Sequence, residues 1–173
     1  QTRFAEKGGN LRWISPGHDQ DSGWLSESLL KRIGAPIATA GKVRKLVENH
    51  HFLNSFKDGP PSDSSLRRLS RRIYPATTNE LHYVMRSDHL GRPPLVSPEQ
   101  KKRLADYSNR IAELAVNDSA PKPILLGRHL IEIGLKPGIL FKEILSLAYE
   151  AQLDGFFESS EEAINWIREN KLV

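Results

Sequence analysis

Apolar residues recur every three or four positions along most of the chain, which is the spacing of amphipathic helices. One segment shows this clearly, because Leu66, Leu69 and Ile73 share one helical face. The opposite face of the same segment carries Arg67, Arg68, Arg71 and Arg72. The pattern predicts helices over residues 17–33, 37–49, 63–74, 79–90, 98–116, 127–133, 138–153 and 161–170.

The first sixteen residues show a different pattern. Two short apolar segments flank Gly8-Gly9-Asn10, which favours a small β-hairpin. We expect this hairpin to be the only sheet, and Ser15 or Asp19 to cap the helix that follows. The fold class is therefore all-α, with a short N-terminal hairpin.

The strongest linker signal is the segment 117–123, Asn-Asp-Ser-Ala-Pro-Lys-Pro, which is rich in turn residues. We place a domain boundary there. The sequence then divides into a helical domain over residues 1–117 and a small helical tail over residues 118–173.

Composition narrows the classes of protein that this chain represents. Its 173 residues are 38% hydrophobic and 27% charged, which indicates a folded domain rather than a disordered segment. No apolar run reaches the length of a membrane span, and the first residues do not form a secretory signal. The absence of cysteine excludes disulfides and thiolate metal sites and fits a cytoplasmic protein. A net charge of +4 permits an anionic partner such as nucleic acid.

The residues that could carry chemistry are four imidazole and carboxylate groups near predicted helix ends: His18, His50, His51 and Asp88. Imidazole and carboxylate together bind divalent metals such as Mn, Fe, Ni, Co and Zn. The alternative is that each histidine is simply a surface residue or a hydrogen-bonded buried one.

Three segments resemble an HD-type phosphohydrolase domain, in particular that of the tRNA nucleotidyltransferases, the CCA-adding and poly(A) polymerase family. They are Ser15-Pro16-Gly17-His18-Asp19, Val47-Glu48-Asn49-His50-His51 and the segment 86–92 around Asp88. The resemblance implies that His18 and one of the two adjacent histidines match the family's later histidines, and that Asp88 matches its closing aspartate.

The resemblance also implies a gap. In that family an earlier histidine and a His-Asp doublet supply the first metal ligands, and the present chain would begin just after them. We therefore expect no resident cofactor here. Mn, Ni, Co or Mg would bind only if the missing ligands were supplied, because a smaller ligand set binds metal poorly.

The C-terminal part resembles the tail of the same family. The resemblance rests on the segment 126–138, Leu-Gly-Arg-His-Leu-Ile-Glu-Ile-Gly-Leu-Lys-Pro-Gly, and on Ala151-Gln152-Leu153-Asp154-Gly155 further on. A phosphate would be favoured at the start of the helix that follows the turn, beside Arg128 and Lys136. The alternative is a plain helical hairpin in which the glycines serve only the turn.

These observations lead to one interpretation and two rivals. The chain is interpreted as the C-terminal region of a tRNA nucleotidyltransferase-like protein, which holds tRNA by phosphate contacts from the four arginines of the segment 67–72 and from Arg128 and Lys136. It lacks the Gly-Ser and Asp-x-Asp motifs of the nucleotidyltransferase head, so we expect that head to be a partner and this chain alone not to be catalytic. The first rival is a metal-dependent HD-type phosphohydrolase acting on nucleotides or phosphodiesters. The second is a structural or protein-interaction module.

Overall fold

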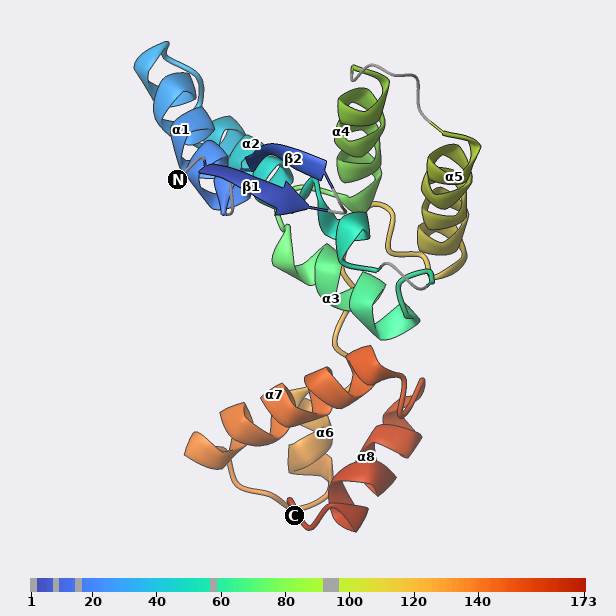
Figure 1. Ribbon diagram of the computed structural model, residues 1–173. Coiled ribbons are helices and arrows are strands. Elements are labelled where there is room, and N and C mark those ends of the chain that lie inside the picture. The colour runs from blue at the N-terminus through green and yellow to red at the C-terminus, as the bar shows by residue number, and fades with distance from the viewer. Residues whose placement is uncertain (1–2, 8–9, 15–16, 57–58, 92–96) are drawn as a thin grey trace.

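The computed structural model describes residues 3–7, 10–14, 17–56, 59–91 and 97–173. These residues form an all-helical fold with a two-stranded hairpin at its start, and the predicted all-α class is confirmed (Figure 1). The helices are α1 (His18–Arg32), α2 (Ile37–Asn49), α3 (Asp63–Arg72), α4 (Thr78–Leu90), α5 (Pro98–Glu113), α6 (Gly127–Glu132), α7 (Ile139–Asp154) and α8 (Ser160–Glu169), with a 3-10 turn η1 (Phe52–Ser55) after α2.

The hairpin consists of β1 (Arg3–Lys7) and β2 (Asn10–Ile14), which pair antiparallel. The register sets Phe4 opposite Trp13 and Lys7 opposite Asn10.

Four of the eight described helices begin at a hydroxyl side chain that accepts a backbone N–H of the first turn. Such a cap satisfies one of the donors that a helix start leaves without a partner. The capping residues are Ser62 for α3, Thr77 for α4, Ser97 for α5 and Ser159 for α8. The last three form reciprocal capping boxes with a Glu or Gln three residues later.

The start of α1 differs from the prediction. Its N-cap is Gly17, in the left-handed conformation with φ of 76°, and no side chain caps it. The prediction of an Asp19 cap was therefore wrong, because the Asp19 carboxylate turns toward the histidines instead. Ser15, the other candidate, lies outside the described residues.

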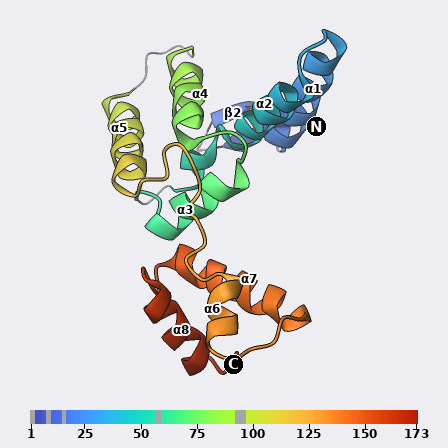
Figure 2. The same cartoon turned by 180° about the vertical axis from the view of Figure 1, so that it is seen from behind.

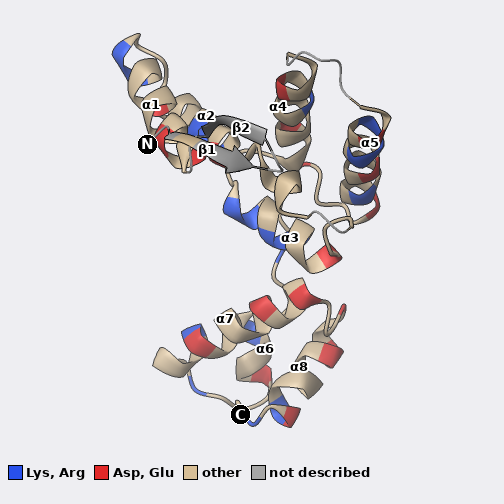
Figure 3. Ribbon diagram, viewed as in Figure 1, with Lys and Arg blue, Asp and Glu red and all other residues tan. Residues whose placement is uncertain are grey.

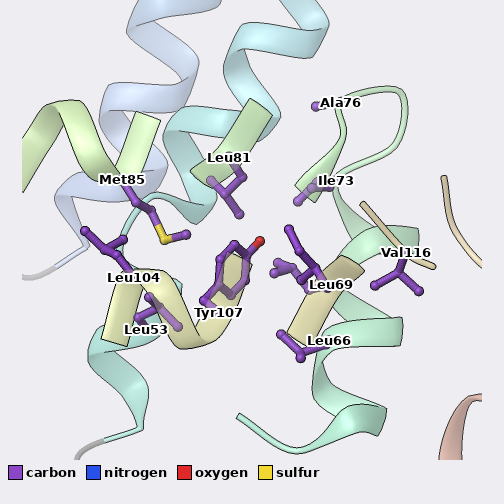
Figure 4. Packing of buried hydrophobic residues seen from close by; sticks show 11 residues of the cluster. Leu53, Leu66, Leu69, Ile73, Ala76, Leu81, Met85, Leu104, Tyr107 and Val116 are labelled. Carbon is purple, nitrogen blue, oxygen red and sulfur yellow. The ribbon is translucent and has the colours of Figure 1, made fainter. Parts of the chain in front are cut away.

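Two separate groups of buried side chains lie on either side of the linker. The first core is made by η1, α3, α4, α5 and the chain that follows them (Figure 4): Leu53, Leu66, Leu69, Ile73, Ala76, Leu81, Met85, Leu104, Tyr107, Ile111 and Val116. The second core is made by the tail helices and their flanking loops: Leu125, Leu130, Ile144, Ala148, Ala151, Phe157, Ala163 and Ile167. Figures 1 and 2 show the two groups of helices as separate lobes joined by the linker.

Buried polar contacts tie the linker to both lobes. On the first side, the Asn117 carbonyl accepts from the Asn79 N–H at 3.1 Å and from Thr78 Oγ1 at 3.3 Å. The Thr78 carbonyl in turn accepts from the Tyr107 hydroxyl at 3.1 Å. On the tail side, the Gln152 amide donates to the Lys122 carbonyl at 2.8 Å and accepts from the Ile124 N–H at 2.9 Å. These bonds satisfy backbone groups that would otherwise lack partners.

The first two helices form a hairpin that projects from the first lobe. Gly23 of α1 is buried against α2, where an added Cβ would come within 2.5 Å of Glu48 Cγ. This close approach sets the start of α1 beside the end of α2. The outer face of α1 carries an apolar stripe that is at least half exposed: Trp24, Leu25, Leu29 and Ile33. No helix among the described residues is long and apolar enough to cross a membrane.

Candidate functional site

The start of α1 and the end of α2 bring four side chains together. His18 and Asp19 lie in the first turn of α1, His50 caps the C-terminus of α2, and His51 directly precedes η1 as its N-cap. One ligand atom from each of these four residues lies within 4.8 Å of the others. Three of the four residues that the sequence singled out for metal are therefore neighbours in space, and Asp19 joins them. We call these four residues the histidine cluster.

Asp19 is the centre of the cluster. Its Oδ1 lies 2.9 Å from His51 Nδ1, 3.1 Å from His18 Nε2 and 3.8 Å from His50 Nδ1. The same oxygen is buried, and no described group donates an aligned hydrogen bond to it. A buried carboxylate oxygen without a hydrogen bond requires an explanation, and a cation held between it and the neighbouring ring nitrogens would supply one.

The ring of His50 is oriented by the backbone. Its Nδ1 donates to the Val47 carbonyl at 2.6 Å, which leaves Nε2 with its lone pair available. Metal-binding histidines are commonly held in this way by their second nitrogen. His89 makes a similar bond to the Met85 carbonyl of its own helix, so its ring is engaged away from the cluster.

Burial favours the neutral ring of His51. Burial and the neighbouring His50 lower the pKa of His51, while the carboxylates of Asp19 and Asp88 act in the opposite direction. Neutral imidazole is the form that binds a metal ion.

The cluster opens into a pocket of about 760 Å³ between α1, α2 and α4. Its walls are His18, Ser22, Val47, His50, His51, Tyr83, Val84, Ser87 and Asp88. Asp88, the predicted fourth ligand, lies on the α4 side of this pocket with Oδ2 4.0 Å from His51 Nε2. It is a neighbour of the cluster rather than one of its four members.

The donor atoms of the histidine cluster fit a divalent transition metal. Three imidazoles and one carboxylate are the ligands that Mn, Co, Ni and Zn accept. The family resemblance implied that missing ligands would have to be supplied, yet Asp19 of this chain places a carboxylate at the centre of the cluster. The sequence signal for Asp19 as a ligand is its position directly after His18 in the first turn of a helix. The prediction that Asp19 caps the helix left this signal unused.

Three of the four arginines of α3, Arg67, Arg68 and Arg71, contact α7 of the tail. Arg68 donates from Nη1 and Nη2 to the two carboxylate oxygens of Asp154, at 2.6 and 2.8 Å, and lies 3.4 Å from Glu150. Arg71 pairs with Glu150 and stacks on the Tyr149 ring, 4.9 Å from its centroid. Figure 3 shows the basic segments of α3 next to acidic segments of α7.

The outer two arginines are less strongly engaged. Arg67 donates to the Leu153 carbonyl at 3.4 Å, and Arg72 lies over the Phe52 ring at 5.8 Å. The predicted phosphate-binding face is therefore partly occupied by side chains and backbone of the same molecule.

The two predicted cations of the tail, Arg128 and Lys136, are exposed. Neither pairs with a carboxylate in the parts of the chain that the structure describes. Arg128 Nε lies 3.2 Å from His129 Nε2, and His129 Nδ1 accepts the Leu126 N–H. The tail thus presents positive charge that is available to a ligand.

Comparison with known proteins gives one informative relative. The chain is 44% identical over 122 residues to the A-adding tRNA nucleotidyltransferase of Halalkalibacterium halodurans. The match covers 68% of this chain and 25% of the relative. No family model matches the sequence, and no solved structure matches it.

Proposed function

We propose, for a chain that is homologous to part of a tRNA nucleotidyltransferase, that its role is to hold the body of a tRNA. A nucleotidyltransferase head would carry out nucleotide addition. The observation that carries the proposal is the 44% identity to an A-adding tRNA nucleotidyltransferase. Such a role belongs in the cytoplasm.

The distribution of charge supports the proposal. Arg128 and Lys136 of the tail are exposed and lack a described acidic partner, so phosphate can reach them directly. Phosphate contacts from such side chains do not depend on base sequence, which suits a surface that holds many tRNAs. The α3 arginines form a second group of cations.

We further propose that the chain has two functional parts, residues 1–117 and 118–173, as the linker predicted. The two separate hydrophobic cores support this division. In this arrangement the helical domain supports the histidine cluster, and the tail supplies the exposed cations for RNA.

The tRNA-holding role is tested by direct binding of a tRNA transcript. The test variant is Arg128→Gln with Lys136→Gln, and the matched control is Arg32→Gln with Lys101→Gln. Both pairs remove two exposed cations, so they change net charge equally. We expect the tail variant to lose about tenfold more affinity than the control. Equal losses would contradict a specific role for the tail cations.

The histidine cluster supports a second candidate function, a metal-dependent HD-type phosphohydrolase. The specific observation is that four potential ligands lie within 4.8 Å, beside a pocket of about 760 Å³ that could admit a phosphate ester. A bound divalent ion would supply Lewis-acid chemistry there. His18, Asp19, His50 and His51 would hold it, and Asp88 would face the pocket.

Hydrolysis of bis(p-nitrophenyl) phosphate with added Mn²⁺ separates this candidate from the first. Activity that His18→Ala abolishes would support the phosphohydrolase. No activity together with tight tRNA binding would support the tRNA-holding role. If neither activity nor binding is found, the remaining interpretation is a structural or protein-interaction module.

A further inference from the structure

Two of the arginines that were predicted to bind RNA phosphate already pair with carboxylate side chains of the same chain. Arg68 and Arg71 both contact Glu150, and Arg68 also makes two hydrogen bonds to Asp154. The two carboxylates are four residues apart on α7, which places them about 6 Å apart along the helix axis. They form a pair of anions at a spacing similar to that of successive phosphates on a nucleic-acid strand.

The chemistry of the guanidinium group allows it to exchange a carboxylate partner for a phosphate. Its planar fork of N–H donors matches carboxylate and phosphate equally well. The Arg68 side chain is 41% exposed and the Glu150 side chain is 43% exposed, so solvent and a dissolved polyanion can reach both. Ion pairs at such exposure contribute little free energy, and a ligand with several phosphates can compete with them.

The architecture allows this contact to open. The first core and the second core share no buried residue, and the linker is hydrogen-bonded to each lobe separately. The α3–α7 contact includes the ion pairs of Arg68 and Arg71 with Glu150 and Asp154, and the bond from Arg67 to the carbonyl of the buried Leu153. Its separation would break these contacts and leave the two hydrophobic clusters themselves intact.

We propose that Glu150 and Asp154 occupy the phosphate-binding positions of α3 in the free protein, and that bound tRNA displaces them and releases α7 from α3. This inference rests on the proposed tRNA-holding function. The coupling is reciprocal: bound tRNA weakens the contact between α3 and α7, and that contact weakens the binding of tRNA by the same factor.

The first test compares tRNA affinity of Glu150→Gln with Asp154→Asn against a matched control, Glu143→Gln with Glu169→Gln. Glu143 and Glu169 are exposed and have no ion pair among the described residues. Both variants raise the net charge by two, so the control measures the effect of charge alone. We expect the test variant to gain at least fivefold in affinity over the control. Equal gains would overturn the proposal, and a loss would show that the contact assists binding.

The second test measures tail position. The sequence contains no cysteine, so Asn109→Cys on α5 and Asn165→Cys on α8 allow specific fluorophore labelling. We expect the energy transfer between the labels to fall when a tRNA transcript binds. Binding with unchanged transfer would overturn the inference alone. Absence of binding in every variant would instead overturn the proposed tRNA-holding function.

Discussion

Arg68 and Asp154 join the two lobes through a bidentate pair. The guanidinium nitrogens Nη1 and Nη2 lie 2.6 and 2.8 Å from the two carboxylate oxygens. The residues are 86 positions apart in the chain, so the pair fixes a long-range relationship between α3 and α7. The guanidinium of Arg68 lowers the pKa of Asp154, and the carboxylate raises the pKa of Arg68.

The pair should contribute a modest, salt-sensitive coupling energy. In a double-mutant cycle of Arg68→Gln and Asp154→Asn, we expect a coupling of about 0.5–1 kcal/mol, because both groups are more than one third exposed. Urea denaturation at low and high salt measures it. A coupling that does not decrease at high salt would contradict an ionic origin.

The buried hydroxyl of Tyr107 should stabilise the first core. It donates to the Thr78 carbonyl at 3.1 Å, and both residues are almost fully buried. Tyr107→Phe would leave that carbonyl without this donor, which costs about 1 kcal/mol of unfolding free energy. Tyr74→Phe is the control, because Tyr74 is 73% exposed. Equal effects of the two substitutions in urea denaturation would disprove this assignment.

His82 should make the protein less stable in mild acid. Burial, with a contribution from Arg86, lowers the pKa of His82, and its Nδ1 is buried without a hydrogen bond to any described residue. The unfolded chain therefore takes up a proton more readily than the folded protein as the pH falls below about 6.5, the ordinary histidine pKa. The contribution of His82 to the unfolding free energy is complete above that pH and is lost as the pH falls below it.

The test compares unfolding free energies between pH 8 and pH 5 for the wild type and His82→Phe. Phenylalanine keeps the nearly parallel stacking on Tyr107, where the rings are tilted by 8°. We expect a smaller decrease with falling pH in the variant. Part of the decrease in unfolding free energy should remain in the variant, because the pKa of His51 is also lowered. Unfolding free energies that fall equally with pH in the wild type and the variant would exclude a contribution from His82.

Asp19 should determine whether the histidine cluster binds metal. Isothermal titration of chelator-treated protein with Mn²⁺, Co²⁺ or Ni²⁺ measures the affinity. We expect Asp19→Asn to weaken binding by about tenfold or more, because it removes the anionic ligand. Asp21→Asn, two residues further on the exposed side of α1, should bind as the wild type does. Equal affinities of the two variants would remove Asp19 from the site.

The helices were largely predictable because their signals are local. Thr77 with Glu80 and Ser97 with Gln100 mark helix starts within four residues of sequence, and the structure places α4 and α5 at those points. The turn-rich composition of residues 117–123 predicts a linker in the same local way. Such signals involve residues that are close together in the chain, so a single sequence is enough to recognise them.

The contacts that define the candidate sites were less visible. Helical spacing showed the arginine face of α3, but not that Glu150 and Asp154 would cover part of it from about 80 residues away. The apolar spacing of α1 likewise did not show that Leu25 and Leu29 would be exposed. Sequence spacing determines which face a residue lies on, and only tertiary packing determines what that face meets.

The central claim is tested most directly by the salt dependence of tRNA affinity for the wild-type chain. We expect the logarithm of the association constant to fall linearly with the logarithm of salt concentration, with a slope of about −1.5 or steeper. That slope corresponds to two or more phosphate contacts at roughly 0.7–0.9 per contact. Undetectable binding, or an affinity that salt does not change, by a well-folded sample would contradict the tRNA-holding role.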